Sequence, residues 1–236
     1  MGSQFDTNFM VTVALKAAIK YIPITLELAL VPFIVGTILG TIIALVRLYN
    51  IKFISRILQV FVVIVKGVPV VLQLLIVYFA VLQCFDSIAK GLHLAIRAKN
   101  INSVYIGLIA LSFFATAYIS EAIRGALIAV KEGQYEAGYS VGLTKAQTLI
   151  RIILPQALPV AMPMLCSNLI GLVKGSSLVF MISVTDLLNG ALITANSNYK
   201  FLEAYVAAAI VYWVMCIIIE KIFYSLEKRF YAFNRG

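Results

Sequence analysis

Charged residues are scarce in this sequence: 12% of its 236 residues are Asp, Glu, Lys or Arg, while 62% are hydrophobic. A soluble domain is usually about a quarter charged and about half apolar. The chain therefore has too little charge to cover a globule with polar surface. Its mean hydropathy of +1.01 indicates instead that most of its surface faces lipid, which argues against the soluble classes of enzyme.

Residues that hold metals or carry out reactions are scarce as well. The single histidine, His93, cannot form a metal cluster alone, and Cys84, Cys166 and Cys216 lack the spacing of a metal or redox site. We expect the three cysteines to be small buried hydrophobic side chains. No glycine-rich loop cradles a phosphate, and no nucleophile stands with a base and an orienting group. We therefore expect a chain that is not an enzyme, holds no metal or cofactor, and depends on another subunit for any energy it uses.

The net charge of +9 does not indicate a nucleic-acid-binding protein. Such proteins gather their basic residues in a patch or stripe on one polar face. Here the lysines and arginines stand at the ends of apolar runs, which is the pattern that membrane topology produces. The charge thus supports the interpretation as an integral membrane protein.

Apolar runs of about 20 residues are long enough to cross a bilayer as helices. The sequence holds five such runs: Ile22–Val46, Ile57–Leu82, Ser103–Val130, Ile152–Leu188 and Leu202–Ile219. Residues 1–236 are therefore predicted to form one all-α, polytopic transmembrane domain. The second run is interrupted at Lys66, Gly67 and Pro69.

A shorter stretch precedes the first run. Residues 7–21 place Phe9 and Val13 at helical spacing, with Lys16 and Lys20 on another face. This pattern suits a helix that lies on the membrane surface. It also suits a leader that frays into the first span, and the sequence leaves both alternatives open.

The lysines and arginines of the connecting segments are unevenly distributed over the two sides of the membrane. Eleven fall on the side of residues 131–151 and of the C-terminus, and six fall on the other side. Short loops rich in lysine and arginine stay in the cytoplasm. We therefore predict that the N-terminus is outside, and that the C-terminus and the loop 131–151 are cytoplasmic.

The polar segment between the third and fourth runs has its own pattern. Gly133 and Gly142 bracket eight residues, enough for about two helical turns, in which polar and amphipathic side chains alternate. This favours a short helix between two breaks that docks in a groove of a partner, with Glu136 paired to a basic group at the rim. The alternative is an ordinary loop with one helical turn.

Several runs of residues, taken together, resemble a known family. They are Ala117–Gly125, Gly133–Ala137 with Gly142, Ile153–Ala157, Lys66-Gly67-Val68-Pro69 with Gln73, and Asn168 with Lys174-Gly175-Ser176-Ser177-Leu178. Over residues 25–224 the chain resembles the membrane (permease) subunits of ATP-binding-cassette (ABC) importers of the polar amino acid uptake family. The resemblance implies a type I importer fold, a place in the bacterial plasma membrane, and ATP-driven alternating access that moves a polar or neutral amino acid inward.

The same resemblance implies partners. Two ATPase subunits would carry the ATP and magnesium, a second permease (the same chain or a close relative) would complete the pathway, and an extracytoplasmic binding protein would deliver the amino acid. In this family the Glu-Ala-Ala signature forms the coupling helix that seats in the ATPase. The resemblance assigns this role to Gly133, Gln134, Tyr135, Glu136, Ala137, Gly138 and Gly142. Gly138 replaces the second alanine, which weakens a helix by up to about 1 kcal/mol.

Charged residues within spans are costly unless they face a cavity or a partner, so each is a functional hypothesis. Lys174 stands before a Gly-Ser-Ser run that invites an unwound turn at the depth where substrate sites are built. We expect Lys174 to attract the carboxylate of an amino acid, and the hydroxyls of Ser176 and Ser177 to hydrogen-bond it. Alternatively, Lys174 snorkels or pairs with an acid such as Glu27 or Asp186.

Other polar residues complete the candidate substrate pathway. Lys66, Gln73 and Asn168 belong to the runs that carry the resemblance, and Lys66 either contacts the substrate or supports the pathway. Glu121 and Arg124 share a helix face, so they form either an intrahelical ion pair or part of an inner gate. The fourth run begins with three prolines at every fourth position, so we expect a broken helix start there, or mere bending.

The departures from the family pattern bear on the substrate. Gly175 stands where the family usually has aspartate, and Val68 where it usually has threonine. Loss of the aspartate removes a negative group that would favour cationic side chains. We therefore expect a neutral or zwitterionic amino acid, with cystine as one candidate, over arginine or lysine. A secondary transporter would show more spans and an inverted repeat, and a scaffold would need no docking loop, so neither class fits as well.

Overall fold

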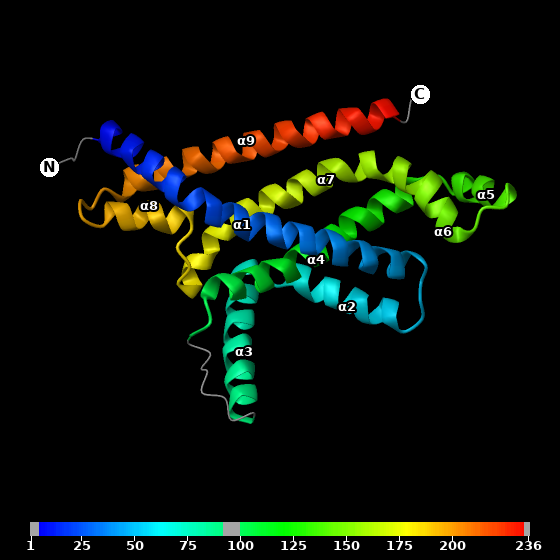
Figure 1. The fold of residues 1–236 in the computed structure, drawn as a ribbon, viewed down its shortest axis with the longest axis horizontal. Coiled ribbons are helices and arrows are strands. Elements are labelled where there is room, and N and C mark those ends of the chain that lie inside the picture. Colours follow the sequence, from blue (N-terminus) through cyan, green and yellow to red (C-terminus); the bar gives the residue numbers. More distant parts are fainter. Residues whose placement is uncertain (1–4, 92–99, 234–236) are drawn as a thin grey trace.

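The computed structural model describes residues 5–91 and 100–233. Within these ranges the regular structure is helical (Figure 1). The α-helices are α1 (Thr7–Leu48), α2 (Ile54–Gly67), α3 (Val70–Gly91), α4 (Ser103–Ala129), α5 (Glu132–Ser140), α6 (Lys145–Thr148), α7 (Leu154–Gly175), α8 (Leu187–Ala195) and α9 (Phe201–Phe233). A π-helical turn, η2 (Leu149–Ile153), leads into α7, and a 3₁₀ segment, η3 (Ser176–Ile182), follows it.

Five helical segments are long and apolar enough to cross a membrane, which confirms the all-α fold with five spans. They are Thr7–Leu48, Val70–Gly91, Ser103–Ala129, Lys145–Ile182 and Phe201–Phe230. The expected second span, 57–82, is wrong in its bounds, because the chain breaks inside it. The 14 residues of α2 are too few to cross the bilayer alone, whereas the 22 residues of α3 suffice.

The break between α2 and α3 has a clear cause. Pro69 has no N–H with which to bond the carbonyl four residues earlier, that of Val65. Val68 takes an extended conformation (ψ 132°), and the side-chain amide of Gln73 donates to the carbonyl of Val65 and, at 2.6 Å, to that of Val68. The amide thus repairs the break, and α3 leaves at a steep angle to α2 (Figure 1).

The first helix is much longer than the hydrocarbon layer is thick. Its 42 residues extend over about 63 Å at 1.5 Å per residue, against about 30 Å of hydrocarbon. Residues 7–21 are its first turns rather than a separate helix, and Asp6 caps them by accepting a hydrogen bond from the N–H of Phe9 (2.9 Å). Val13 is buried, while Lys16 and Lys20 are exposed. Whether these turns lie on the membrane surface stays a prediction.

The two ends of the bundle carry different elements (Figure 1). The start of α1, the whole of α8 and the start of α9 gather at one end, whereas α5, α6 and the last turns of α9 lie toward the other. Lys200 forms an ion pair with Asp6 at the first end (2.5 Å), and this hydrogen bond lowers the pKa of the Asp6 carboxyl. The start of α1 and the end of α9 therefore lie on opposite sides, as an odd number of spans requires.

Buried polar groups anchor the short helix α8. The carboxylate of Asp186 is fully buried; it caps α8 by accepting from the N–H of Asn189 (3.1 Å), and it also accepts from the hydroxyl of Tyr212 in α9 (2.6 Å). The N–H of Leu187 donates to the hydroxyl of Thr25 in α1 (3.1 Å). The three helices are thus joined by bonds that satisfy every polar group involved.

Close contact between α1 and α4 forms the centre of the bundle, and two glycines permit it. A Cβ atom added at Gly36 would lie 2.6 Å from the Cβ of Ala115, and one at Gly40 would lie 2.9 Å from the backbone nitrogen of Ser120. Small residues spaced four apart are the usual means by which helices approach closely in membranes. Nothing in the sequence pattern singled out these two positions.

We predict that Gly40→Ala destabilises the protein by about 1–3 kcal/mol, because the added methyl group overpacks the contact with α4. Thermal unfolding of the purified protein in detergent measures the effect. Gly125→Ala is the matched control, since a Cβ atom there meets open space and alanine favours the helix. Equal melting temperatures for the two variants would contradict the prediction.

Candidate functional site

The segment between α4 and α7 folds as the sequence predicts, into a short helix between two turns. α5 starts at Glu132, one residue before Gly133, because Lys131 is extended (ψ 138°). It ends where Gly142 adopts a positive φ of 79°. The N–H groups of Gly142 and Leu143 then donate to the carbonyls of Tyr139 and Gly138 (3.0 and 3.1 Å), a Schellman motif that ends the helix sharply.

One face of α5 is exposed and the other packs inward. Glu136, Ala137, Ser140 and Val141 are exposed, and Val141 retains 76% of its accessible area. Within the described part of the chain, the carboxylate of Glu136 forms no ion pair. Tyr135 and Gly138 point the other way. The helix therefore offers a surface with an unpaired negative charge at one end of the bundle.

Gly138 is required by packing. A Cβ atom at this position would lie 2.5 Å from Cγ2 of Thr148 and 2.7 Å from its hydroxyl oxygen. The side chain of Thr148 is β-branched and stiff in a helix, so it cannot move aside cheaply. The helix-weakening effect of glycine is thus offset by the close seating of α5 against α6.

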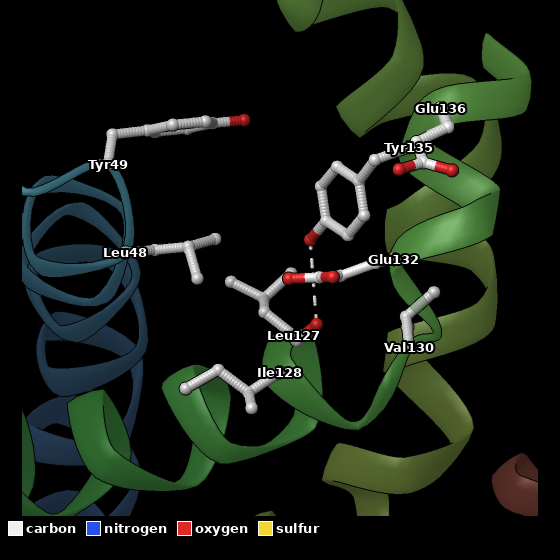
Figure 2. Close-up of a pocket in the computed structure, with 8 residues that line it drawn as sticks. All are labelled: Leu48, Tyr49, Leu127, Ile128, Val130, Glu132, Tyr135 and Glu136. Carbon is white, nitrogen blue, oxygen red and sulfur yellow. Dashed lines mark hydrogen bonds between the residues drawn. The ribbon is translucent and has the colours of Figure 1, made fainter.

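Tyr135 lies at the edge of a pocket of about 460 Å³ between the ends of α1 and α4 and the helix α5 (Figure 2). The pocket is lined by Leu48, Tyr49, Leu127, Ile128, Val130, Glu132, Tyr135 and Glu136. The hydroxyl of Tyr135 donates a long hydrogen bond (3.5 Å) to the carbonyl of Leu127. Partial burial raises the pKa of Tyr135, and so does the nearby phenol of Tyr49. Tyr135 thereby fixes the orientation of α5 relative to α4.

A turn, residues 141–144, joins α5 to α6, and the chain is then helical without interruption into the fourth span. α6 begins with a capping box, in which Thr144 and Gln147 exchange hydrogen bonds, and it passes through the π turn η2 directly into α7. The helix is irregular at η2 but is not interrupted there or at Pro155 in the first turn of α7, so the expected broken helix start is wrong. The amide of Gln156 in α7 donates to the side chain of Gln134 in α5 (3.1 Å), so α5 and α7 are in direct contact.

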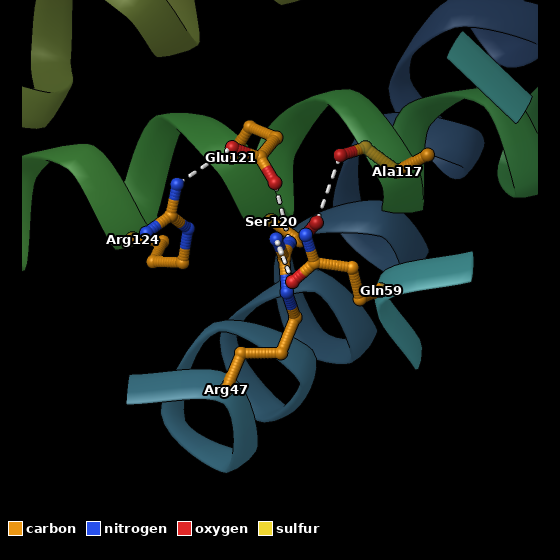
Figure 3. Close-up of polar contacts among 6 residues, drawn as sticks. All are labelled: Arg47, Gln59, Ala117, Ser120, Glu121 and Arg124. Atoms are coloured by element: carbon orange, nitrogen blue, oxygen red, sulfur yellow. Dashed lines mark hydrogen bonds and ion pairs between the residues drawn. The ribbon is translucent and has the colours of Figure 1, made fainter. Parts of the chain in front are cut away.

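Glu121 and Arg124 form the expected ion pair along α4 (3.2 Å), but the structure adds a third charge (Figure 3). Arg47, at the end of α1, also pairs with Glu121, and its side chain is only 6% exposed. Arg47 donates a further bond to Gln59 of α2 (3.4 Å). The cluster therefore ties together three helices near the α5 end. In the sequence Arg47 stands out only as a topology marker, because its partner is 74 residues away.

Three of the predicted pathway residues come together beside α7. A pocket of about 380 Å³ lies between α4 and α7; it is lined by Tyr118, Glu121, Ala122, Pro163, Met164, Ser167 and Asn168. The ammonium group of Lys66 lies 5.6 Å from the centre of the Tyr118 ring. Lys66, Glu121 and Asn168 thus border one polar region, which we call the polar pocket.

The remaining pathway residues are placed differently. Lys174 is exposed and lies seven residues, about two turns, after Ser167, so it shares the helix face that borders the polar pocket. The hydroxyl of Ser176 is buried and donates to the backbone carbonyl of Val173 (2.8 Å). The hydroxyl of Ser177 donates to the backbone carbonyl of Lys174 (2.6 Å). The helix type changes after Lys174 as expected, but η3 is a 3₁₀ segment, wound more tightly than an α-helix rather than unwound, and its hydroxyls are used within the chain.

The alternative partners of Lys174 are also placed by the structure. No ion pair joins Lys174 to Glu27 or Asp186 in the described ranges, and Asp186 is engaged by Tyr212. Gln73 is used to repair the α2–α3 break. Contact of Lys174, Ser176, Ser177, Gln73 or Lys66 with a substrate, and an inner gate at Glu121 and Arg124, stay predictions.

Five spans, a pocket bordered by polar side chains and a short exposed helix in contact with the fourth span are features of the membrane subunit of a transporter. The chain belongs to the family of binding-protein-dependent transport system inner membrane components, whose family model matches residues 36–231. It is a permease subunit of an amino-acid ABC transporter and not an enzyme; ATP hydrolysis belongs to a separate ATPase. It is a multi-pass protein of the bacterial inner membrane.

Curated relatives support this assignment over nearly the whole chain. A probable amino-acid ABC transporter permease of Vibrio harveyi is 31% identical over 92% of this chain and 93% of its own length. An L-cystine transport system permease of Bacillus subtilis is 33% identical over 97% of this chain and 93% of its own length. An arginine ABC transporter permease of Haemophilus influenzae is also 33% identical, over 90% of this chain and 92% of its own length.

Solved structures agree with the fold. The chain is similar to one in a crystal structure of an amino acid ABC transporter with histidines, with a TM-score of 0.80, 29% identity and coverage of 97% of this chain and 100% of that one. A methionine ABC transporter in an inward-facing conformation has the same fold at 18% identity (TM-score 0.67; 89% of this chain and 95% of that one).

We predict that Gly138→Ala destabilises the seating of α5 by about 1–3 kcal/mol, since the new methyl group collides with Thr148. The double variant Gly138→Ala/Thr148→Ala is expected to recover most of the loss, because it removes the colliding atoms, and the lost hydroxyl has no hydrogen-bond partner. The thermal unfolding of the complex and its stimulated ATPase activity are measured for the single and the double variant. Gly133→Ala, which meets open space, is the control; no rescue in the double variant would refute the explanation.

Proposed function

We propose that this permease imports a neutral or zwitterionic amino acid, with cystine as one candidate, and that α5 is the coupling helix that docks on the ATPase. In this proposal the N-terminus is outside, and α5 and the C-terminus are cytoplasmic. The chain itself binds no cofactor, and ATP with magnesium is held by the ATPase. The exposed face of α5, with its unpaired Glu136, is the observation that carries the proposal.

The link from α5 to α7 supports alternating access as the mechanism. Closure of two ATPase subunits on ATP would push α5. The bond between Gln134 and Gln156 and the path through η2 would carry this push to α7. Because α7 forms one wall of the polar pocket, its displacement would change the access to that pocket. Hydrolysis of ATP would then return the helices to their starting arrangement.

The charges around the polar pocket support a substrate without a net positive charge. Lys66 and Lys174 offer positive charge to a carboxylate. Glu121 is already held by two arginines, so it is a poor partner for a cationic side chain. Gly175 leaves no carboxylate where the family usually has aspartate. The relatives include both cystine and arginine permeases, so their names favour neither class.

The complete transporter is expected to contain a second permease and a binding protein. A second permease, the same chain or a close relative, would face the polar pocket and complete the pathway. α3 has little buried surface within one chain, which leaves it free to contact either that partner or lipid. An extracytoplasmic binding protein would deliver the amino acid at the end that carries α8, since α5 occupies the opposite end (Figure 1).

Reversal of the charge on α5 tests the coupling role. Glu136→Lys is expected to abolish transport and to lower the binding-protein-stimulated ATPase activity by at least about tenfold. The physical reason is that a lost charge pair at a buried interface costs about 2 kcal/mol or more. The protein should still fold, because Glu136 is exposed. Glu227→Lys, in the last turns of α9, controls for charge reversal alone. Normal stimulation in Glu136→Lys would contradict the assignment of α5.

Competition experiments in proteoliposomes test the substrate class. Neutral amino acids, cystine among them, are expected to compete for uptake better than arginine or lysine. Gly175→Asp should raise the competition by arginine, because it adds a carboxylate next to Lys174. If basic amino acids competed best with the unchanged protein, the proposed substrate class would be wrong while the coupling role of α5 would stand.

A further inference from the structure

A second pocket, of about 410 Å³, lies on the other side of α4 and α7 from the polar pocket. Five elements contribute to its wall: α1 with Thr41, α4 with Leu127, η2 with Ile150, α7 with Leu158 and Ala161, and α9 with Phe230. Its volume is in the range of ligand pockets, about 300–1,000 Å³. We call it the apolar pocket.

The two pockets take different residues of α7. The apolar pocket receives Leu158, Ala161 and Leu165, which follow one another at steps of three or four residues and therefore share a face. The polar pocket receives Pro163 and Ser167 from the opposite face, together with Met164 and Asn168, and it lies further toward the C-terminal end of α7. Because substrate is expected on the polar face, the apolar pocket belongs to the side of the bundle that faces away from the pathway.

The chemistry of the apolar pocket suits a hydrocarbon chain. Its two hydroxyls, on Thr37 and Thr41, each donate to a carbonyl of α1 itself (2.7 and 2.6 Å), so their protons are not available to a ligand. The inner wall includes Ala126 and Ala161, which are almost fully buried, whereas Ile150 at the rim is 62% exposed. A ligand can thus enter from the side of η2 without finding a free hydroxyl proton inside.

Two basic residues are the chain neighbours of residues that line this pocket. Arg151 follows Ile150 in the chain, and Arg229 precedes Phe230. Both arginines are exposed, and neither takes part in an ion pair in residues 5–91 and 100–230. Basic side chains at the ends of spans attract anionic lipid headgroups. A hydrocarbon pocket with two free guanidinium groups beside it is complementary to a lipid with a negative headgroup.

We propose that the apolar pocket holds one acyl chain of an anionic phospholipid, whose phosphate is bound by Arg151 and Arg229. A second copy of the chain is a poorer occupant, since the proposed assembly already places it against the polar pocket. The site contacts η2 and the first turns of α7, so the bound lipid braces the helix that α5 moves.

Photochemical cross-linking locates the lipid. The complete transporter, permease with its ATPase, is placed in phosphatidylcholine nanodiscs that contain phosphatidylglycerol with a diazirine at the end of one acyl chain. We expect cross-linked peptides from α7 and α9 around Leu158 and Phe230. Adducts spread over α3 and the outer surface of α9, without enrichment in these peptides, would overturn the proposal.

Charge-removing variants test the headgroup contact. Arg151→Gln and Arg229→Gln are each expected to lower the phosphatidylglycerol retained in native mass spectrometry by about fivefold. Lys221→Gln is the matched control: it removes an exposed charge from α9 about two turns further from the rim. Equal loss in the control would overturn the proposal, because it would indicate attraction by net charge alone. A disulfide between two copies that carry Leu158→Cys would also overturn it, by showing that a second copy covers the pocket.

Discussion

Inside a bilayer a backbone carbonyl or amide without a partner finds no water, so the chain itself must repair every break in a spanning helix. This constraint is met at each irregular point of the structure. Gln73 supplies the donor that Pro69 lacks, and Asp186 accepts from the first turn of α8. The serines after Lys174 bond to carbonyls of the turn that contains them. The breaks are consequently well-defined hinges between rigid helices.

A displacement of α5 can reach α7 only if the helices between them move as rigid units. α5 is short and would not be stable alone; it is held by Tyr135 against α4 and by Gly138 against Thr148. Because Gly138 lies directly against Thr148, a tilt of α5 toward α6 would displace α6. In the proposed mechanism this displacement would pass through η2 to α7. The close contacts of α5 would then serve coupling as well as stability.

Local pattern in the sequence was sufficient for the five spans, the short helix between Gly133 and Gly142, the break at Pro69 and the change of helix type after Lys174. Each of these depends on neighbours in the chain: hydropathy, glycine, or a missing N–H. The pairing of Arg47 with Glu121, the close approach at Gly36 and Gly40, and the need for glycine at 138 depend on residues far away in the chain or on the next element. Hydropathy and helical periodicity do not reveal which residues far apart in the chain come into contact. Ser176 is the opposite case. Its residue type suggested a side chain that binds substrate, whereas its burial places it within the turn.

The two faces of α7 link substrate and lipid physically. Both pockets lie between α4 and α7, on opposite sides, so a displacement of α7 relative to α4 cannot change one without changing the other. A lipid that binds one arrangement of the helices more tightly stabilises that arrangement, and by thermodynamic reciprocity the arrangement set by α5 alters lipid affinity by the same factor. The composition of the membrane thereby becomes a term in the energetics of transport. That coupling follows because α4 and α7 contribute walls to both pockets.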